Sequence, residues 1–281
     1  MTTRLRIVSW NIAHREECWR FLVGKGYDVA LLQEASPPPS DLLGRVRVSD
    51  APWALGGVGL RREWRSAVVG LSERVEIRWL PVAPVDGADA STLGVSRSGT
   101  LEVAEVVWNG GTEKVCLASL YAAWEAPLGD GERRQIYADA SAHRLISDLT
   151  ALLDSEARPR LVAAGDLNLL RGYGEDGSPL WKARYDTVFA RMEAVGVPFV
   201  GPELAVGSGP RGRVPAERPA DSRTVPTFRT RVADPDSATR QLDFVFASRA
   251  LRPLVRTRAR DAPEEWGPSD HCRIEIELDP S

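Results

Sequence analysis

Polar side chains stand at the ends of several short apolar runs in this sequence. Four runs end at an amide, a carboxylate or a tyrosine, and two further runs begin beside an aspartate or a histidine. In a mixed sheet, antiparallel neighbours bring the start of one strand beside the end of another. We therefore expect these groups to meet at one edge of a sheet structure. Their residues are Asn11, Glu34, Tyr121, Asp166 with Asn168, Asp243, and Asp270 with His271.

The four carboxylates in this set repel one another unless a positive charge lies among them. The ligands on offer are mostly oxygen atoms, since the three cysteines are far apart and only His271 adds an imidazole. Oxygen-rich sets suit Mg²⁺ or Mn²⁺ better than Zn²⁺. Because Mg²⁺ usually binds through one or two carboxylates and a substrate phosphate, the pattern predicts metal-assisted phosphoryl chemistry.

The apolar runs have the length of strands, and several are rich in β-branched or aromatic residues. Apolar residues follow helical spacing in three other stretches, residues 16–26, 131–154 and 180–196. Many strands and few helices along the whole chain predict an α/β fold of two packed sheets with helices outside. The strand-like runs cover residues 5–10, 28–33, 66–71, 75–80, 100–108, 114–121, 160–165, 242–247, 253–260 and 272–278.

A long loop is predicted at residues 201–240, which are rich in Gly, Pro, Asp and Ser. A loop of this length in a compact domain is either functional or a variable solvated segment. It carries seven arginines against five acidic residues, a mild positive excess in a chain of net charge −3. That net charge argues against a strongly electrostatic nucleic-acid binder but permits a basic patch.

Composition places the chain among ordinary globular proteins, with 43% hydrophobic and 27% charged residues. No apolar run approaches the length of about 18 residues that a membrane span needs. The N-terminus leads directly into a strand-like run with no apolar signal segment. We therefore predict a cytoplasmic protein with reduced cysteines and no membrane span.

Five short motifs occur in the order and approximate spacing of the endonuclease/exonuclease/phosphatase superfamily, which the chain resembles. The motifs are SWNI, LLQE, AGDLN, LDFVFAS and PSDH. Each is weak by itself, but five in the right order are specific, and the resemblance spans residues 5–278. It implies a four-layer α/β/β/α sandwich with two packed mixed β-sheets, like that of pancreatic DNases and abasic endonucleases. It also implies a single catalytic domain over residues 1–281.

The resemblance implies a metal site as well. Glu34 matches the metal-binding glutamate of the family, and Asn11 beside it helps to hold metal or phosphate. Asp270 matches an aspartate near the metal that is sometimes a second ligand. The implied ion is Mg²⁺ or Mn²⁺, and whether one or two ions act stays open.

Four further residues match catalytic positions of the family. Asp166 matches the aspartate that orients or deprotonates the attacking water, and Asn168 matches the asparagine that hydrogen-bonds a phosphate oxygen in the transition state. His271 matches the histidine at the scissile phosphate, with Asp243 as its carboxylate partner. Such a carboxylate fixes the imidazole tautomer and raises the pKa of the histidine, which favours a cation facing phosphate.

Two residues have alternative interpretations. Tyr121 looks like the tyrosine of abasic endonucleases, but the asparagine that follows it in those enzymes is replaced by Ala122, Ala123 and Trp124. Tyr121 either positions phosphate or caps its strand. His14 either reaches the rim of the site or is an ordinary histidine at a helix start, which is the commoner case.

We predict a metal-dependent phosphoric ester hydrolase, specifically a nuclease that cleaves DNA or RNA phosphodiester bonds by metal-assisted water attack. The alternative is the same chemistry on a phospholipid or a sugar phosphate. An inert binding module is disfavoured because every core motif position is filled. The sequence indicates no partner protein, and we predict a monomer with nucleic acid as its substrate. Its predicted substrate-binding residues are Arg211, Arg213, Arg229 and Trp124.

Overall fold

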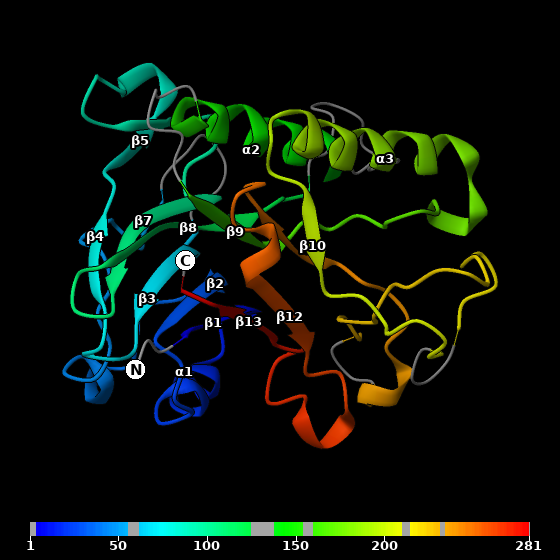
Figure 1. Ribbon diagram of the computed structural model, residues 1–281, viewed down its shortest axis with the longest axis horizontal. Coiled ribbons are helices and arrows are strands. Elements are labelled where there is room, and N and C mark those ends of the chain that lie inside the picture. Colours follow the sequence, from blue (N-terminus) through cyan, green and yellow to red (C-terminus); the bar gives the residue numbers. More distant parts are fainter. Residues whose placement is uncertain are drawn as a thin grey trace.

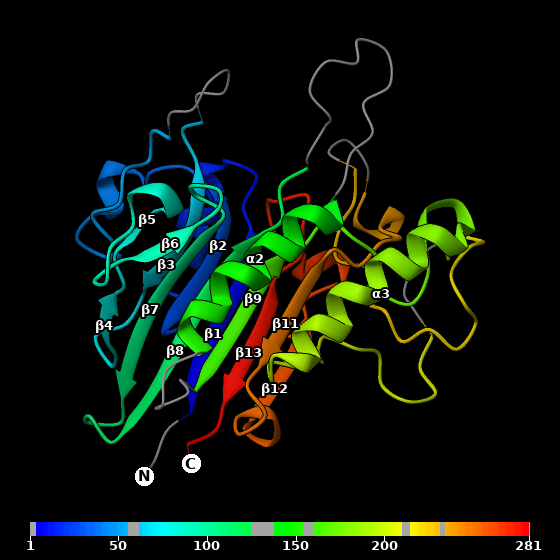
Figure 2. The ribbon, with the colours of Figure 1, turned by 90° about the horizontal axis from the view of Figure 1, so that it is seen from above.

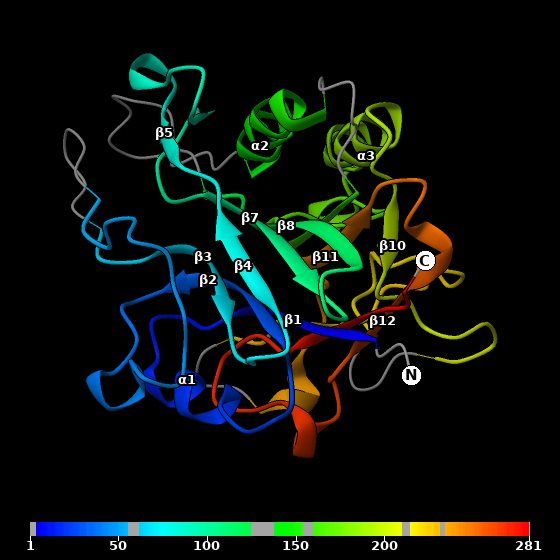
Figure 3. The ribbon, with the colours of Figure 1, turned by 60° about the vertical axis from the view of Figure 1, so that its left-hand side comes forward.

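Two large β-sheets pack face to face, and helices cover their outer faces (Figure 1). The computed structural model describes residues 4–55, 62–124, 138–153, 160–209, 214–230 and 234–280. Figure 3 shows the same layers from another side, with two long helices over one sheet and a short helix against the other. The predicted four-layer α/β/β/α sandwich is therefore confirmed.

The first sheet is centred on β1, which runs parallel to β2 and antiparallel to β13. The strand order is β12-β13-β1-β2-β3. These directions place the carboxyl ends of β1 and β2 beside the start of β13. The strands are β1 (Leu5–Asn11), β2 (Val29–Ala35), β3 (Arg65–Gly70), β12 (Val255–Ala259) and β13 (Ile274–Leu278).

The second sheet repeats this arrangement around β9, which is parallel to β8 and antiparallel to β11. The strand order is β10-β11-β9-β8-β7-β4, and β5 and β6 form a separate parallel pair. The carboxyl ends of β8 and β9 thus lie beside the start of β11. The strands are β4 (Glu76–Trp79), β5 (Val82–Pro84), β6 (Leu93–Val95), β7 (Leu101–Trp108), β8 (Glu113–Tyr121), β9 (Leu161–Asp166), β10 (Phe199–Gly201) and β11 (Asp243–Ala247).

An apolar layer fills the space between the two sheets. Strand β13 shows how alternation produces it, because Ile274, Ile276 and Leu278 are buried while Glu275 and Glu277 remain partly exposed. Burying one such aliphatic side chain contributes roughly 1.5–3 kcal/mol. The layer therefore holds the sheets together and leaves polar strand ends at the sandwich edge.

Helices close the two outer faces. The short α1 (Glu16–Leu22) buries Cys18, Trp19 and Leu22 against the first sheet. The longer α2 (Ala138–Leu153) and α3 (Pro179–Ala194) lie over the second sheet, as the view from above shows (Figure 2). At the start of α3, the Ser178 hydroxyl accepts a hydrogen bond from the backbone nitrogen of Trp181, which caps the helix.

The observed elements follow the predicted ones with a few differences. Every predicted strand-like run carries a strand, but the three-residue strands β5, β6 and β10 were not predicted, since alternation is unreadable over three residues. Helix α1 ends at Leu22 rather than at Gly26, because the backbone of Val23 is already extended. Of the predicted helix at 131–154, residues 131–137 and 154 lie outside the described residues.

The predicted loop at 201–240 carries little regular structure in its described parts. A 3₁₀ turn at Pro235–Ser237 and isolated bridges from Phe228 to Arg240 and to His271 are found there. The second bridge brings the loop to the start of β13. Among the described residues, no helix is long and apolar enough to cross a membrane.

Gly165 supports a prediction about the pairing of β8 and β9. A Cβ atom at this position would collide with the backbone carbonyl of Leu120 in β8. We expect Gly165→Ala to lower the free energy of unfolding by about 2 kcal/mol or more, since backbone cannot give way as a flexible side chain can. Urea denaturation measures this, with Gly44→Ala as the control because no atom lies within 4 Å of its Cβ. Equal stability of the two variants would contradict the prediction.

Candidate active site

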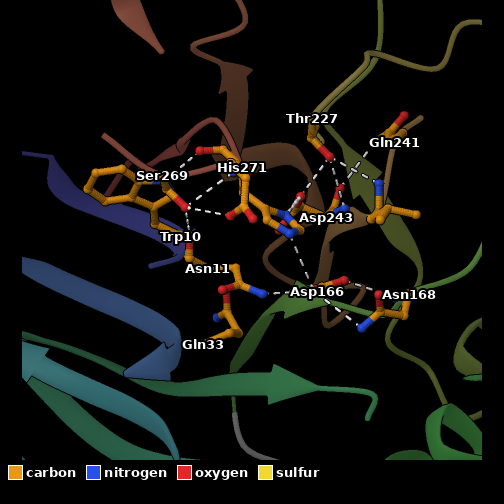
Figure 4. A network of polar contacts seen from close by, with 12 residues as sticks. Trp10, Asn11, Gln33, Asp166, Asn168, Thr227, Gln241, Asp243, Ser269 and His271 are labelled. Carbon is orange, nitrogen blue, oxygen red and sulfur yellow. Dashed lines mark hydrogen bonds and ion pairs between the residues drawn. The ribbon is translucent and has the colours of Figure 1, made fainter. Parts of the chain in front are cut away.

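The first sheet contributes one half of a polar cluster at the sandwich edge (Figure 4). Asn11 is the last residue of β1, and Glu34 lies near the end of β2. Asp270 and His271 stand just before β13, whose start lies beside those ends. The structure thus brings together the four residues that the sequence placed at three separate strand ends.

The second sheet contributes the other half. Tyr121, Asp166 and Asp243 lie side by side in register on β8, β9 and β11. Asn168 follows two residues after Asp166, and its backbone nitrogen donates to Asp166 Oδ1 over 2.9 Å. Strand direction thus gathers these groups at one edge of the second sheet, and the packing of the two sheets brings them to the first set.

Asn11 links the two sheets through its amide. Its Nδ2 donates to Glu34 Oε1 over 3.1 Å and to Asp166 Oδ2 over 2.9 Å. Its Oδ1 accepts a hydrogen bond from the backbone nitrogen of Ala13 over 3.0 Å. Because Oδ1 is used in this way, the amide presents its NH₂ group to the carboxylates and reduces their repulsion.

His271 and Asp243 form a close buried pair. The imidazole Nδ1 lies 2.8 Å from Asp243 Oδ2, and Nε2 lies 3.8 Å from Asp166 Oδ2. Burial by itself would lower the pKa of His271, but the charges of Asp243 and Asp166 outweigh it and raise this pKa to about 10. At neutral pH the imidazole is therefore a cation in the cavity wall.

Thr227, in the 201–240 loop, orients this pair and was not predicted from the sequence. Its hydroxyl donates to Asp243 Oδ2 over 2.6 Å. Thr227 Oγ1 also accepts hydrogen bonds from two backbone nitrogens, that of Leu242 over 3.0 Å and that of Asp243 over 3.2 Å. A threonine in an aperiodic loop gives no sequence signal, so only the folded chain reveals the contact.

Asp166 is almost completely buried between the sheets. Burial raises its pKa against the opposing effect of the His271 charge. A carboxylate with a raised pKa accepts a proton from water more readily than an exposed one. This position suits Asp166 to a general base.

Tyr121 lies beside the cluster with its ring buried. Burial, together with the Glu34 and Asp166 charges, raises the pKa of Tyr121 well above its usual range. The phenol therefore keeps its proton and can act as a hydrogen-bond donor. The indole of Trp64 meets the phenol ring edge-on, with centroids 5.2 Å apart.

A cavity of about 180 Å³ opens among these residues. Its wall includes Trp124, whose exposed fraction is 44%, and five residues that were not predicted, namely Ala13, Glu175, Phe228, Arg240 and Leu242. Phe228 packs on the imidazole of His271 with ring centroids 4.9 Å apart, and Arg240 pairs with Glu175 over 2.8 Å. Phe228 and Arg240 belong to the 201–240 loop, so at least part of that loop lies at the cavity.

Left-handed backbone conformations gather around the cluster. Ala13, His14, Glu34 and Asn168 all have φ between 46° and 61°. Each costs free energy for a residue with a side chain, and such residues persist where surrounding contacts hold them. The strain thus falls on turns that aim polar groups at the cavity.

Sequence comparison identifies the family. A sequence model described as the Endonuclease/Exonuclease/phosphatase family matches residues 8–271. The chain belongs to this family. Its members are hydrolases that act on phosphate esters, which agrees with the carboxylates and the imidazole around the cavity. No curated protein sequence matches the chain.

Solved structures share the fold at low sequence identity. The AP endonuclease LMAP from Leishmania major is 15% identical with a TM-score of 0.60, over 99% of this chain and 88% of that one. An AP endonuclease from Archaeoglobus fulgidus is 13% identical, with a TM-score of 0.60 over 98% and 99%. The 3′ phosphatase NExo from Neisseria, bound to a product DNA hairpin, is 15% identical, with a TM-score of 0.57 over 98% and 99%.

The donor set of this family member fits a hard divalent ion. Among the described residues, no three His, Cys, Asp or Glu side chains converge as a preformed metal cage. Glu34 and Asp270 nevertheless both line the cavity. Mg²⁺ usually binds through one or two carboxylates and completes its shell with water and substrate phosphate. The two carboxylates therefore meet the protein's share of such a site.

The predicted substrate-binding residues are placed only in part. Trp124 lies on the cavity wall, and its contact with substrate stays a prediction. The backbone nitrogen of Arg229 donates to the Asp270 carbonyl over 3.0 Å, and its side chain folds toward the Ser269 carbonyl, 3.4 Å away. Arg211 and Arg213 lie outside the described residues.

Thr227 provides a test of the site as a positioned unit. Thr227→Val removes a donor to Asp243 and leaves two backbone N–H groups without this acceptor, which costs about 1–3 kcal/mol of stability. We expect kcat to fall about 10-fold or more with little change in KM, since Thr227 orients Asp243 and does not line the cavity. Steady-state kinetics measure this, and Thr227→Ser is the control that keeps the hydroxyl. If the valine and serine variants have the same kcat, Thr227 is not a positioning residue.

Proposed function

We propose that the protein is a divalent-metal-dependent nuclease that hydrolyses phosphodiester bonds of DNA or RNA. One observation carries the proposal. Asp166 lies 3.8 Å from the cationic His271 on the wall of a cavity that Glu34 and Asp270 also line. The cavity wall thus holds three kinds of group: a base that can accept a proton from water, a cation that can face phosphate, and two carboxylates that can bind a metal ion.

The residues divide the chemistry among them. Asp166, whose pKa burial raises, orients the attacking water and accepts its proton. His271, held by Asp243, donates a hydrogen bond to a phosphate oxygen and stabilises the charge that develops there. Glu34 and Asp270 would hold the divalent ion, which when bound supplies Lewis-acid polarisation of the phosphate.

Asn168 and Tyr121 are the remaining candidates for contact with phosphate. In the structure, Asn168 Nδ2 is directed at the Ala122 carbonyl, 3.2 Å away, and at Asp166 Oδ2, 3.3 Å away. Its donation to a phosphate oxygen therefore requires the side chain to turn. Tyr121 keeps its proton, but its hydroxyl interacts with Glu34, so a contact with phosphate requires it to leave that partner.

Aromatic walls and the DNA-acting relatives support nucleic acid as the substrate. Trp124 and Phe228 both line the cavity, and aromatic rings are surfaces on which bases stack. Two of the proteins with this fold are AP endonucleases, and a third is bound to a DNA hairpin. We also propose that the enzyme is a monomer with a single domain and that it is cytoplasmic.

Metal dependence is the first test. We expect EDTA to abolish cleavage and added Mg²⁺ or Mn²⁺ to restore it, because the carboxylates must be neutralised before phosphate approaches. Asp166→Asn and His271→Ala should each lower kcat by about 100-fold or more. His143→Ala is the matched control, since this histidine lies between α2 and α3, 3.1 Å from the Thr187 hydroxyl. Full activity in metal-free buffer would refute the metal assignment.

A substrate panel separates nucleic acid from other phosphoesters. We expect cleavage of single-stranded or duplex oligonucleotides, with a shallow salt dependence of binding, since the net acidic chain is expected to contact few phosphates. Arg→Ala changes at Arg211, Arg213 and Arg229 should weaken binding and flatten the slope further. Hydrolysis of a phospholipid or a sugar phosphate with no cut in DNA or RNA under any metal condition would replace the nuclease proposal with the alternative.

A further inference from the structure

His14 stands against the carboxylate that is the main candidate for metal binding. Its Nε2 lies 3.1 Å from Glu34 Oε2, while Glu34 Oε1 accepts from Asn11 Nδ2, also over 3.1 Å. The His14 side chain is 40% exposed, so solvent ions reach it. Of its two interpretations, the structure favours the one in which His14 reaches the site, since it contacts Glu34, which lines the cavity.

The backbone holds the imidazole in this position. The His14 nitrogen donates to the Glu34 carbonyl over 3.0 Å, so the two residues are joined through the main chain as well. Ala13 and His14 are consecutive left-handed residues with φ of 46° and 61°. Glu34, which accepts the His14 hydrogen bond, is also left-handed with φ of 47°. The indole of Trp64 packs on the imidazole with ring centroids 5.1 Å apart. The left-handed turn at Ala13 and His14, the left-handed residue Glu34 near the end of β2, and the Trp64 ring thus direct Nε2 at the carboxylate.

The Asn11 side-chain oxygen does not face the Glu34 carboxylate, where His14 Nε2 lies. Oδ1 accepts from the Ala13 nitrogen, and the NH₂ group faces Glu34 and Asp166. Turning the amide over would set its NH₂ group against the Ala13 N–H, two donors facing each other. The His14 Nε2 atom, unlike the Asn11 oxygen, thus faces Glu34 Oε2 and is a side-chain atom that can bind an ion there.

The distance between the two atoms suits two ligands of one ion. Adjacent ligands of an octahedral ion with bonds of 2.0–2.1 Å lie about 3 Å apart. The separation of 3.1 Å between His14 Nε2 and Glu34 Oε2 matches that spacing. Imidazole nitrogen suits first-row transition ions, whereas Mg²⁺ prefers an all-oxygen shell.

We propose that His14 Nε2 and Glu34 Oε2 bind the same divalent ion, and that His14 biases the site toward a transition ion such as Mn²⁺ over Mg²⁺. This inference rests on the proposed metal-dependent function and specifies its ion. A histidine that only orients Glu34 by a hydrogen bond would leave the ion in an oxygen shell. The two cases differ in whether nitrogen is bonded to the ion.

Mn²⁺ binding to the full-length protein tests the inference without relying on activity. Electron spin echo modulation detects a nitrogen bonded to Mn²⁺, and titration followed by electron paramagnetic resonance measures the Kd. We expect His14→Ala to remove the nitrogen signal and to weaken Mn²⁺ binding about 10-fold. The affinity for Mg²⁺, measured by displacement of Mn²⁺, should fall less than about 3-fold in the same variant. The controls His143→Ala and His271→Ala should keep the signal, which assigns it among the three histidines of the chain.

The outcomes separate this inference from the proposed function. Mn²⁺ binding that depends on Glu34, shown with Glu34→Gln, but has no nitrogen signal from His14 overturns the inference and leaves the metal-dependent nuclease intact. Equal losses for Mn²⁺ and Mg²⁺ in His14→Ala also overturn it. Mn²⁺ binding that is unchanged in Glu34→Gln refutes the proposed metal site, and with it the inference. Circular dichroism spectra confirm that each variant is folded.

Discussion

The carboxylate of Asp166 is buried at the junction of the two sheets, and much of the site is arranged around its charge. An isolated buried charge is expensive, and it is tolerated only when hydrogen bonds and an opposite charge surround it. Asn11 supplies a donor from the first sheet, Asn168 supplies a backbone N–H, and His271 supplies the positive charge. Removing one of these partners leaves the buried Asp166 charge incompletely compensated, so the residues of the cluster depend on one another.

The apolar layer between the sheets creates this situation. Its aliphatic side chains exclude water and bring the strand ends together, so the polar groups at the edge must satisfy one another. Gln33 and Ser119 show the same need for buried polar groups to pair with one another. Gln33 Nε2 donates to the Ser119 hydroxyl, and that hydroxyl donates to the Leu32 carbonyl. Packing energy thus supports a site whose charges would otherwise repel. The outer face of the cluster lines the cavity.

Much of the frame was predictable because strand alternation is a local property. The run from Cys272 to Leu278 shows period two without reference to the rest of the chain. Strand directions within each mixed sheet then place Asn11 beside His271 in the first sheet and Asp166 beside Asp243 in the second. The contacts of the 201–240 loop were not predictable in this way. Thr227, Phe228 and Arg240 meet the site through a segment without periodicity, whose path depends on what it packs against.

The strands of four or more residues, the family and the set of acids and amides at the strand ends could be predicted from the order of residues, since these depend on neighbouring residues and short motifs. Tertiary structure decided how those groups are used. Asn11 and Asp166 are 155 residues apart, and their hydrogen bond exists only after both sheets have packed. The face that Asn11 presents and the approach of His14 to Glu34 follow from left-handed turns. Such turns form because surrounding contacts offset their strain, and no local pattern of residue types encodes that balance.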